Sequence, residues 1–453
     1  MRGTNMSNDF EKSINNRPKI HFAPQQGWLN DPNGLIYVNG KWLIFHQYNP
    51  HDTKWGDMYW AATETEDFIS WKDKGVAMAP DEEGTIYSGC AILDKAGLAG
   101  YGGDKVLYYY TAAGGRSELS KGKPFVQKLA YSNLDGDAVI KTGETVVPYI
   151  EEETRDPKVF YHQPSQAYIM ILHIEKGCFA IYRSRDLRTW EKTQEINDEV
   201  MNECPDLFQV KQDKGEAKRW VLWSAQGCYY LGDFDGYRFD KKSQCQKAYI
   251  PLPDLADFDQ VGPYAAQTFA NTGDKVIQMA WIRCNTAHKG YNGQLSLPVE
   301  VTLSEDANRL RFCPYEIGKS SAQMVQEIKG NKVQQNICNI NNVAYKLRFV
   351  FRTMNTGEIK LQILDETIEI LWEEKKIIID DNELSFDGQE QVDITVFVDT
   401  DVLEIFALDG RCYDIIANRK QELKGEVKVS STENIEGVVE VSELNSIEIE
   451  KVK

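Results

Sequence analysis

The chain has 453 residues, 42% of them hydrophobic and 11% aromatic, which is longer than a single hydrophobic core usually supports and favours two globular domains. Its formal net charge of −18 and pI near 4.9 argue against polyanionic partners such as nucleic acid or an anionic membrane surface. Nine cysteines without paired CxxC spacing disfavour both a disulfide framework and a structural zinc site.

The N-terminal segment does not have the pattern of a targeting sequence. Residues 1–20 lack the apolar core of a signal peptide, and no apolar run of the chain is long enough to span a bilayer. We therefore expect a soluble, cytoplasmic protein with a short N-terminal extension over residues 1–19.

The first two-thirds of the chain is predicted to be all-β. Short runs rich in β-branched and aromatic residues, separated by Gly, Asn and Asp, predict strands over residues 42–45, 106–110, 168–172 and 220–223. Helical periodicity is scarce before residue 310, so residues 20–315 are expected to form one domain of many short strands.

Two short segments suggest an internal repeat. Residues 65–71 (TEDFISW) and 184–190 (SRDLRTW) share the form Ser/Thr-x-Asp-apolar-x-x-Trp after a predicted strand. Recurring units of this kind are typical of propeller blades. Two similar turns, each with a tryptophan packed over it, would explain the two copies equally well.

From about residue 320 the sequence changes to longer alternating strands, over 345–351, 394–398 and 403–406, and the last of these leads into the hairpin signal Asp409-Gly410. These features predict a second all-β domain, a β-sandwich over residues 316–453. Because no exposed row of aromatic residues is evident, a role in bracing the first domain is favoured over sugar binding.

Three acidic side chains stand out as candidates for catalysis. Asp31, Asp156 and Glu203 each have a proline within two residues, and proline restricts its own backbone and that of the preceding residue. Each carboxylate is therefore expected on a stiff loop or strand end, as a precisely built site requires. Taken singly, each fits an ordinary turn or surface acid equally well.

Together the three acids suit a retaining glycosidase. In such an enzyme one carboxylate attacks the anomeric carbon, a protonated carboxyl assists the leaving group, and a further acid can hold sugar hydroxyls. Binding of Ca²⁺ or Mg²⁺ is the lesser alternative, because neither EF-hand spacing nor a phosphate-binding glycine loop accompanies the acids. No metal site and no cofactor are predicted.

The acidic motifs also carry a family resemblance. Residues 28–34 (WLNDPNG), 155–157 (RDP) and 203–206 (ECPD) resemble, in this order, the three signatures of glycoside hydrolase family 32, the β-fructofuranosidase family of invertases, inulinases and levanases. The resemblance extends over nearly the whole chain, with further matching stretches at 45–50, 55–56, 87–90, 264–269, 398–399 and 403–406.

The resemblance implies a five-bladed β-propeller followed by a C-terminal β-sandwich. It assigns Asp31 as nucleophile, Glu203 as general acid/base and Asp156 as the residue that stabilises the transition state through fructose hydroxyls. The residues implied in substrate binding are Asn30, Gln47, Trp55, Tyr87, Ser88, Arg155 and Trp281. Arg155 is expected to keep Asp156 ionised, while burial or nearby negative charge keeps Glu203 protonated.

Two matching segments depart from the family pattern. Leu29 stands where methionine is usual, and residues 87–90 read YSGC in place of the usual FSGS. Neither departure removes a catalytic acid, so both bear on fine specificity. Cys204 has two readings: a sulfur that tunes Glu203, or a small buried residue that supports the loop.

The segment 110–125, together with Trp281 and residues 294–298, looks more like levanases and exo-inulinases than like plant invertases, which favours release of terminal fructose from oligofructans and sucrose. Sucrose 6-phosphate is a rival substrate if Arg116, Lys121 or Lys123 binds the phosphate. Transfer of fructose to another sugar is a second alternative, and a non-catalytic sugar-binding role is disfavoured because all three acids are present. The expected partner is thus a small carbohydrate, and no oligomeric state is predicted.

Overall fold

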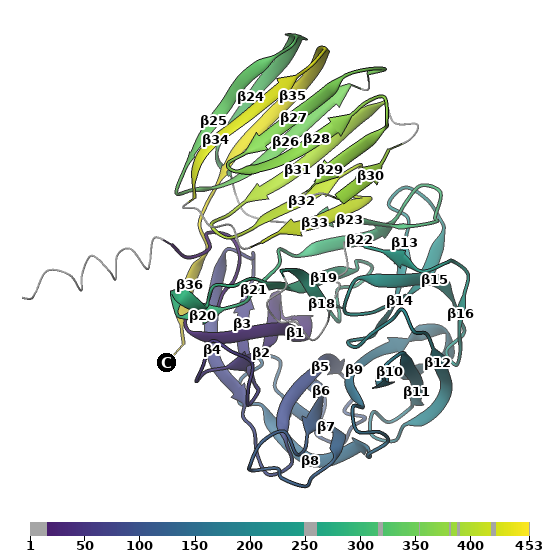
Figure 1. The fold of residues 1–453 in the computed structure, drawn as a ribbon. Coiled ribbons are helices and arrows are strands. Elements are labelled where there is room, and N and C mark those ends of the chain that lie inside the picture. Colours follow the sequence, from purple (N-terminus) through teal and green to yellow (C-terminus); the bar gives the residue numbers. More distant parts are fainter. Residues whose placement is uncertain are drawn as a thin grey trace, which may run out of the picture. The chain divides into compact units, whose positions relative to one another are not determined.

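The computed structural model describes residues 16–248, 261–315, 320–352, 354–379, 382–386, 390–417 and 423–452 (Figure 1). The chain divides into two compact units: a large unit of residues 23–316 and 448–453, and a small unit of residues 1–22 and 317–447. Residues 1–15 of the predicted N-terminal extension lie outside the described residues. The N-terminal segment belongs to the small unit, although the large unit follows it in the sequence. The last residues of the chain belong to the large unit.

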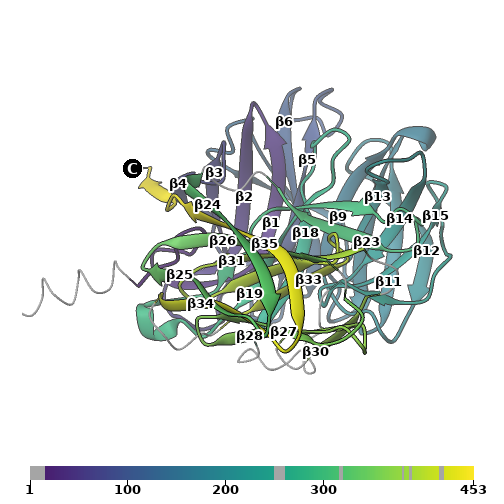
Figure 2. The same cartoon turned by 90° about the horizontal axis from the view of Figure 1, so that it is seen from above.

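The large unit contains five sheets whose strands follow chain order, as the purple-to-teal colouring of Figures 1 and 2 shows. The first four sheets are β1 (Gly27–Val38), β2 (Lys41–Asn49), β3 (Tyr59–Thr65) and β4 (Ser70–Met78); β5 (Thr85–Asp94), β6 (Lys105–Ala113), β7 (Phe125–Ser132) and β8 (Ile140–Val147); β9 (Arg155–His162), β10 (Ala167–Glu175), β11 (Cys178–Ser184) and β12 (Glu191–Asn197); and β13 (Asp206–Lys211), β14 (Lys218–Trp223), β15 (Cys228–Phe234), β16 (Phe239–Lys241) and β17 (Gln246–Lys247).

The fifth sheet and two edge strands complete the large unit. The fifth sheet is built from β18 (Gly262–Thr268), β19 (Ile277–Arg283), β21 (Gln294–Leu295), β22 (Val299–Leu303) and β23 (Leu310–Pro314). Two short strands, β20 (Tyr291–Asn292) and β36 (Glu448–Lys451), pair in parallel with the two edges of the first sheet. The first sheet is therefore closed by residues far away in the sequence.

The four strands predicted in this part of the chain are confirmed, and they occupy equivalent places. Residues 42–45, 106–110, 168–172 and 220–223 lie in β2, β6, β10 and β14, the second strand of each of the first four sheets. The predicted segments of these strands are almost entirely buried. Burial on both faces explains why they read as continuous apolar runs.

The suspected repeat is a repeated turn. In both copies an Asp side chain accepts hydrogen bonds from the backbone N–H groups two and three residues later. Asp67 accepts from Ile69 and Ser70, and Asp186 accepts from Arg188 and Thr189. One turn joins the third and fourth strands of the first sheet, and the other joins those of the third sheet. The repeat thus marks the same point of two equivalent sheets.

The small unit has two six-stranded sheets that share one hydrophobic core. The first is β24 (Ser320–Asn331), β35 (Asn434–Leu444), β26 (Ala344–Arg352), β31 (Gln391–Val398), β32 (Leu403–Ala407) and β33 (Cys412–Ile416); the second is β25 (Gln334–Asn341), β34 (Lys424–Ser431), β27 (Glu358–Ile363), β28 (Glu366–Leu371), β29 (Lys376–Ile379) and β30 (Asn382–Ser385). Alternate residues of β26 and β31 are buried, and Asp409 lies in the predicted turn between the paired strands β32 and β33.

A buried ionic cluster fastens the N-terminal segment to the small unit. The ring of His21 contacts Asp399 Oδ2 at 2.8 Å through Nδ1 and Glu404 Oε1 at 3.0 Å through Nε2. Asp399 also accepts hydrogen bonds from the backbone N–H groups of Lys19, Ile20 and His21. A single acid therefore accepts hydrogen bonds from three consecutive backbone N–H groups.

The structure is all-β, as predicted. In the part of the chain that the structure describes, the helical segments are two short 3₁₀ turns, Gln163–Ser165 and Ala287–Lys289. No helix of these described ranges has the length and apolar character needed to cross a bilayer.

Candidate active site

One cavity of about 150 Å³ in the large unit brings all ten predicted site residues together. It is lined by Asn30, Asp31, Gln47, Trp55, Tyr87, Ser88, Glu153, Arg155, Asp156, Glu203, Tyr264, Trp281 and Arg283. These residues come from the first, second, third and fifth sheets and from the segment before the fourth. No local sequence pattern encodes this meeting point, because the lining residues come from strands and loops that are far apart in the sequence.

Asp31 lies in the first strand of the first sheet, at an irregularity in its pairing. The register between β1 and β2 shifts between Leu29 and Pro32, so the strand is distorted where the acid sits. Asp31 Oδ2 accepts a hydrogen bond of 2.6 Å from Ser88 Oγ of β5. The proline therefore stands inside a bulged strand, and the acid is held by a neighbouring sheet.

Gly89 allows β5 to come this close. A Cβ at this position would lie 1.9 Å from the carbonyl oxygen of Tyr109 in the next strand, so a larger residue does not fit without moving the backbone. The N–H of Gly89 donates to Asn33 Oδ1 at 3.0 Å. Within the YSGC segment, Tyr87 and Ser88 line the cavity, whereas Cys90 is buried behind it and accepts from the N–H of Val159.

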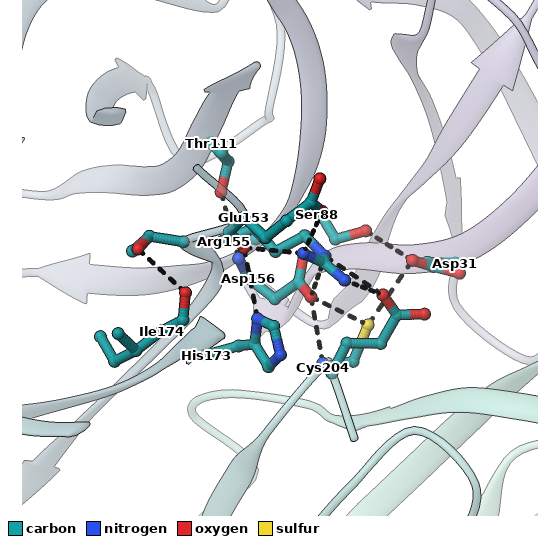
Figure 3. A network of polar contacts seen from close by, with 12 residues as sticks. Asp31, Ser88, Thr111, Glu153, Arg155, Asp156, His173, Ile174 and Cys204 are labelled. Carbon is teal, nitrogen blue, oxygen red and sulfur yellow. Dashed lines mark hydrogen bonds and ion pairs between the residues drawn. The ribbon is translucent and has the colours of Figure 1, made fainter. Parts of the chain in front are cut away.

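Asp156, the second residue of β9, has a backbone conformation that is unusual for this residue type. Its φ is 63°, in the left-handed region, and its N–H donates to Thr111 Oγ1 at 3.1 Å. Its Oδ2 accepts from the N–H of Cys204 at 3.1 Å. Figure 3 shows that the side chains of Asp31, Asp156 and Cys204 point toward one another.

Glu203 lies just before β13 and is held at both oxygens. Oε1 accepts from the hydroxyl of Tyr264 at 2.7 Å, and Oε2 accepts from Arg155 Nη2 at 2.7 Å and Nε at 3.1 Å. Cys204, the next residue, has a φ of 49° and places its Sγ 3.6 Å from Asp31 Oδ2 and 3.5 Å from Asp156 Oδ2. The thiol thus sits between Asp31 and Asp156.

The contacts of the site contradict the prediction that Arg155 keeps Asp156 ionised while burial or nearby negative charge keeps Glu203 protonated. The Nε and Nη2 edge of Arg155 faces Glu203, and Asp156 Oδ2 is farther away, at 3.6 Å from Nε. Adjacency in sequence was misleading because the left-handed backbone at Asp156 turns its carboxylate toward the N–H of Cys204.

The ionisation of the three acids follows from this geometry. Burial, which outweighs the charge of Arg155, raises the pKa of Asp156 to about 7, and burial also raises the pKa of Asp31. Burial opposes ionisation of Glu203, but the charge of Arg155 and hydrogen bonds from Tyr264 and Arg155 lower its pKa to about 2. Acids that interact electrostatically titrate as one group, so near neutral pH the cluster shares a proton that lies mainly on Asp156 and not on Glu203.

The remaining predicted residues form the walls. Trp28 Nε1 donates to Asn30 Oδ1 at 2.8 Å, and Gln47 Nε2 donates to the carbonyl of Ile86 at 2.8 Å, so both amides are fixed. Trp55 is 40% exposed and packs edge-on against Tyr87, with ring centroids 5.9 Å apart. An exposed aromatic beside a polar cavity is suited to contact a sugar ring.

Sequence reasoning did not assign three of the lining residues to the site: Glu153, Tyr264 and Arg283. Tyr264 lies in the stretch 264–269, which resembles the family, so this signal could have identified it. Arg283 is buried, with its guanidinium carbon 3.9 Å from the centre of the Tyr264 ring. Glu153 precedes Arg155 by two residues in an acidic run, where nothing distinguishes it from its exposed neighbours.

The fourth acid of the motifs, Asp206, points elsewhere. Its Oδ2 accepts from the N–H and hydroxyl of Thr268 and lies 3.2 Å from Lys158 Nζ. Asp206 and Lys158 line a larger cavity of about 770 Å³. None of the three candidate catalytic acids lines that cavity, so the smaller cavity is the candidate active site.

Comparison with known proteins places the chain in a family. Residues 21–314 match the model of the glycosyl hydrolases family 32 N-terminal domain. The chain belongs to glycosyl hydrolase family 32. The matched region contains every residue that lines the candidate active site.

Two curated family 32 relatives illustrate the similarity. The chain is 34% identical over 252 residues to a levanase of Bacillus subtilis (strain 168), covering 51% of this chain and 36% of the levanase. It is 31% identical over 297 residues to an extracellular exo-inulinase of Meyerozyma guilliermondii, covering 58% of this chain and 54% of that protein. The chain thus matches from about a third to about half the length of these relatives.

Solved structures share the fold over almost the whole chain. A crystal structure of exo-inulinase from Aspergillus awamori superposes with a TM-score of 0.80 at 20% identity, covering 95% of this chain and 98% of that one. Fructan 1-exohydrolase IIa from Cichorium intybus superposes with a TM-score of 0.79 at 17% identity, covering 97% and 99%. At such identities the likeness concerns the fold alone.

Proposed function

We propose that the protein is a retaining β-fructosidase that hydrolyses terminal β-D-fructofuranosyl residues of fructo-oligosaccharides, fructans and sucrose. The observation that carries this proposal is the convergence of Asp31, Asp156 and Glu203 in one small cavity. Family membership supports the same reaction class, and the relatives described above include a levanase and an exo-inulinase.

The proposed reaction has two steps. Asp31 attacks C2 of the fructosyl unit while Glu203 donates its proton to the departing glycosidic oxygen, so that a covalent fructosyl-Asp31 intermediate forms and the rest of the substrate leaves. Glu203, now ionised, then takes a proton from water, and the hydroxide attacks C2 and frees Asp31. Asp156 hydrogen bonds the fructose hydroxyls during both steps.

The first step needs a proton on Glu203 and an ionised Asp31. Because the three acids share a proton near neutral pH, the required form differs from the dominant one only in where the proton lies. We propose that sugar hydroxyls donating to Asp31 and Asp156 favour ionisation of both aspartates, so that the shared proton moves to Glu203.

We also propose that the five sheets of the large unit are the blades of a five-bladed β-propeller and that the small unit is a β-sandwich. The equivalent positions of β2, β6, β10 and β14 and the turn repeated in the first and third sheets support the first part. The core shared by two six-stranded sheets supports the second.

The contacts of the basic residues favour an unphosphorylated substrate. Arg116 pairs with Glu153 at 2.5 Å, Lys123 with Glu83 at 3.1 Å, and the exposed Lys121 lies 3.9 Å from Glu118. None of these cations lines the cavity that holds the acids. Each is oriented toward a carboxylate, so they do not converge on an anion.

The test is product analysis with purified protein and sucrose, sucrose 6-phosphate, 1-kestose, inulin oligomers and levan oligomers at equal concentration. We expect fructose to be released one unit at a time from the unphosphorylated substrates, with slower turnover of sucrose 6-phosphate. Products longer than the substrate would indicate fructosyl transfer instead. If no fructoside is turned over, the proposed function is wrong.

A further inference from the structure

Arg155 is held between carboxylates on two of its sides. On one side Nη1 donates to Glu153, at 2.8 Å to Oε2 and 2.7 Å to the backbone oxygen. On the other side Nε and Nη2 donate to Glu203 Oε2. Because the guanidinium group is planar, fixing Nη1 on Glu153 decides which edge faces Glu203.

Glu153 is itself held from another sheet. Its Oε1 accepts a hydrogen bond of 2.5 Å from Nη2 of Arg116, in the segment between β6 and β7. The guanidinium carbon of Arg116 also lies 5.4 Å from the ring centre of Phe125. The two oxygens of Glu153 therefore bridge two arginines, and an ionic chain leads from Arg116 through Glu153 and Arg155 to Glu203.

We infer that Glu153 is a positioning residue that aims Arg155 at Glu203 and, through its negative charge, preserves the proton that Glu203 must donate. This inference rests on the proposed function, in which Glu203 is the general acid. Glu153 lines the cavity, but its contacts run to the two arginines and not to the other acids.

The sign of the effect follows from the charges around Glu203. Arg155 favours the ionised form of Glu203, while Asp31 and Asp156 disfavour it. His173, whose Nδ1 lies 3.3 Å from the carbonyl oxygen of Glu153, has its pKa lowered by burial to about 4 and is neutral near pH 7. The remaining charged or titratable groups that line the cavity are Tyr87, Tyr264 and Arg283.

Glu153 offsets part of the charge of Arg155. Without that offset, the full charge of Arg155 acts on Glu203. The acid cluster then loses its shared proton at a lower pH, and Glu203 carries that proton for less of the time. The Glu153 side chain is 46% exposed, so solvent screens the effect and we expect it to be moderate.

The test is the pH dependence of kcat/KM for wild type, Glu153→Gln and the matched control Glu152→Gln, whose side chain is exposed in the same segment. Glutamine keeps the shape of Glu153 but has one acceptor oxygen for two guanidinium groups and no charge. In Glu153→Gln we expect the alkaline limb to move down by about 0.5 to 1 pH unit, with kcat/KM at neutral pH reduced roughly 3- to 10-fold. The control should retain the wild-type profile.

Two outcomes would overturn the inference: superimposable profiles of Glu153→Gln and wild type, or a loss of rate at every pH without movement of the limb, which a merely structural role predicts. Absence of turnover in wild type and control alike would instead count against the proposed function. In that case ¹³C-carboxyl NMR titration, with the Glu203 signal assigned through Glu203→Gln, still decides the inference. A downward shift of the Glu203 titration in Glu153→Gln supports it, and an unchanged titration contradicts it.

Discussion

Asp31→Asn is expected to reduce fructose release by about 10⁴-fold or more, the scale seen when a nucleophile is removed. Asparagine is nearly isosteric and can still accept the hydrogen bond that Ser88 Oγ gives to Oδ2. The cavity should therefore keep its shape while losing the anion that attacks C2. The measurement is kcat/KM on 1-kestose and sucrose, with unfolding temperature as the check on folding.

The matched control for this variant is Asp213→Asn, an exposed acid in the turn between β13 and β14. It should change neither activity nor unfolding temperature. If Asp31→Asn retained more than about a tenth of wild-type activity, a margin far outside the loss expected for a nucleophile, Asp31 would not be the nucleophile.

His21→Gln is expected to remove most of the stability that the ionic cluster gives to the small unit at mild pH. His21 is fully buried; burial lowers its pKa, but hydrogen bonds to Asp399 and Glu404 prevail and raise it to about 9. A shift from 6.5 to about 9 corresponds to roughly 3 kcal/mol of unfolding free energy. Glutamine cannot carry the charge that compensates the two carboxylates.

The pH dependence gives this prediction a sign. A group whose pKa is raised by folding stabilises fully below its unfolded value of 6.5, and the contribution is lost as the pH rises through about 9. Denaturant unfolding between pH 6 and pH 10 should show this loss in wild type and in the control His288→Gln, an exposed histidine. His21→Gln should be less stable at pH 6 and should lack this component of the pH dependence. Equal stability of variant and wild type at pH 6 would show that the cluster contributes nothing.

The sequence was sufficient to locate the candidate site because its chemistry is written in local motifs. Asp31, Asp156 and Glu203 were recognisable from residue type, neighbouring prolines and family resemblance, and the structure brings all ten predicted residues to one cavity. The strands were predictable for a related reason: the second strand of each of the first four sheets contains a segment that is largely buried and strongly apolar.

What could not be predicted depends on side-chain direction and on contacts between distant segments. Asp206 belongs to the same motif as Glu203 yet faces Lys158, because residues three apart on a turn and strand need not face the same way. The sequence predicted Asp156 as the partner of Arg155 and was wrong for a similar reason: the left-handed backbone at Asp156 turns its carboxylate away from Arg155. The last strand, β36, completes the first sheet. It does so by pairing with residues more than 300 positions earlier in the sequence, and no local pattern predicts such a pairing.

The most direct test of retaining hydrolysis through Asp31 is the anomeric form of the first fructose released, followed by NMR during rapid hydrolysis of a β-fructoside. Two successive displacements at C2 predict that β-D-fructofuranose appears first and only later equilibrates with the other forms. Initial release of the α-anomer would mean a single displacement by water, and a covalent fructosyl-Asp31 intermediate would be ruled out.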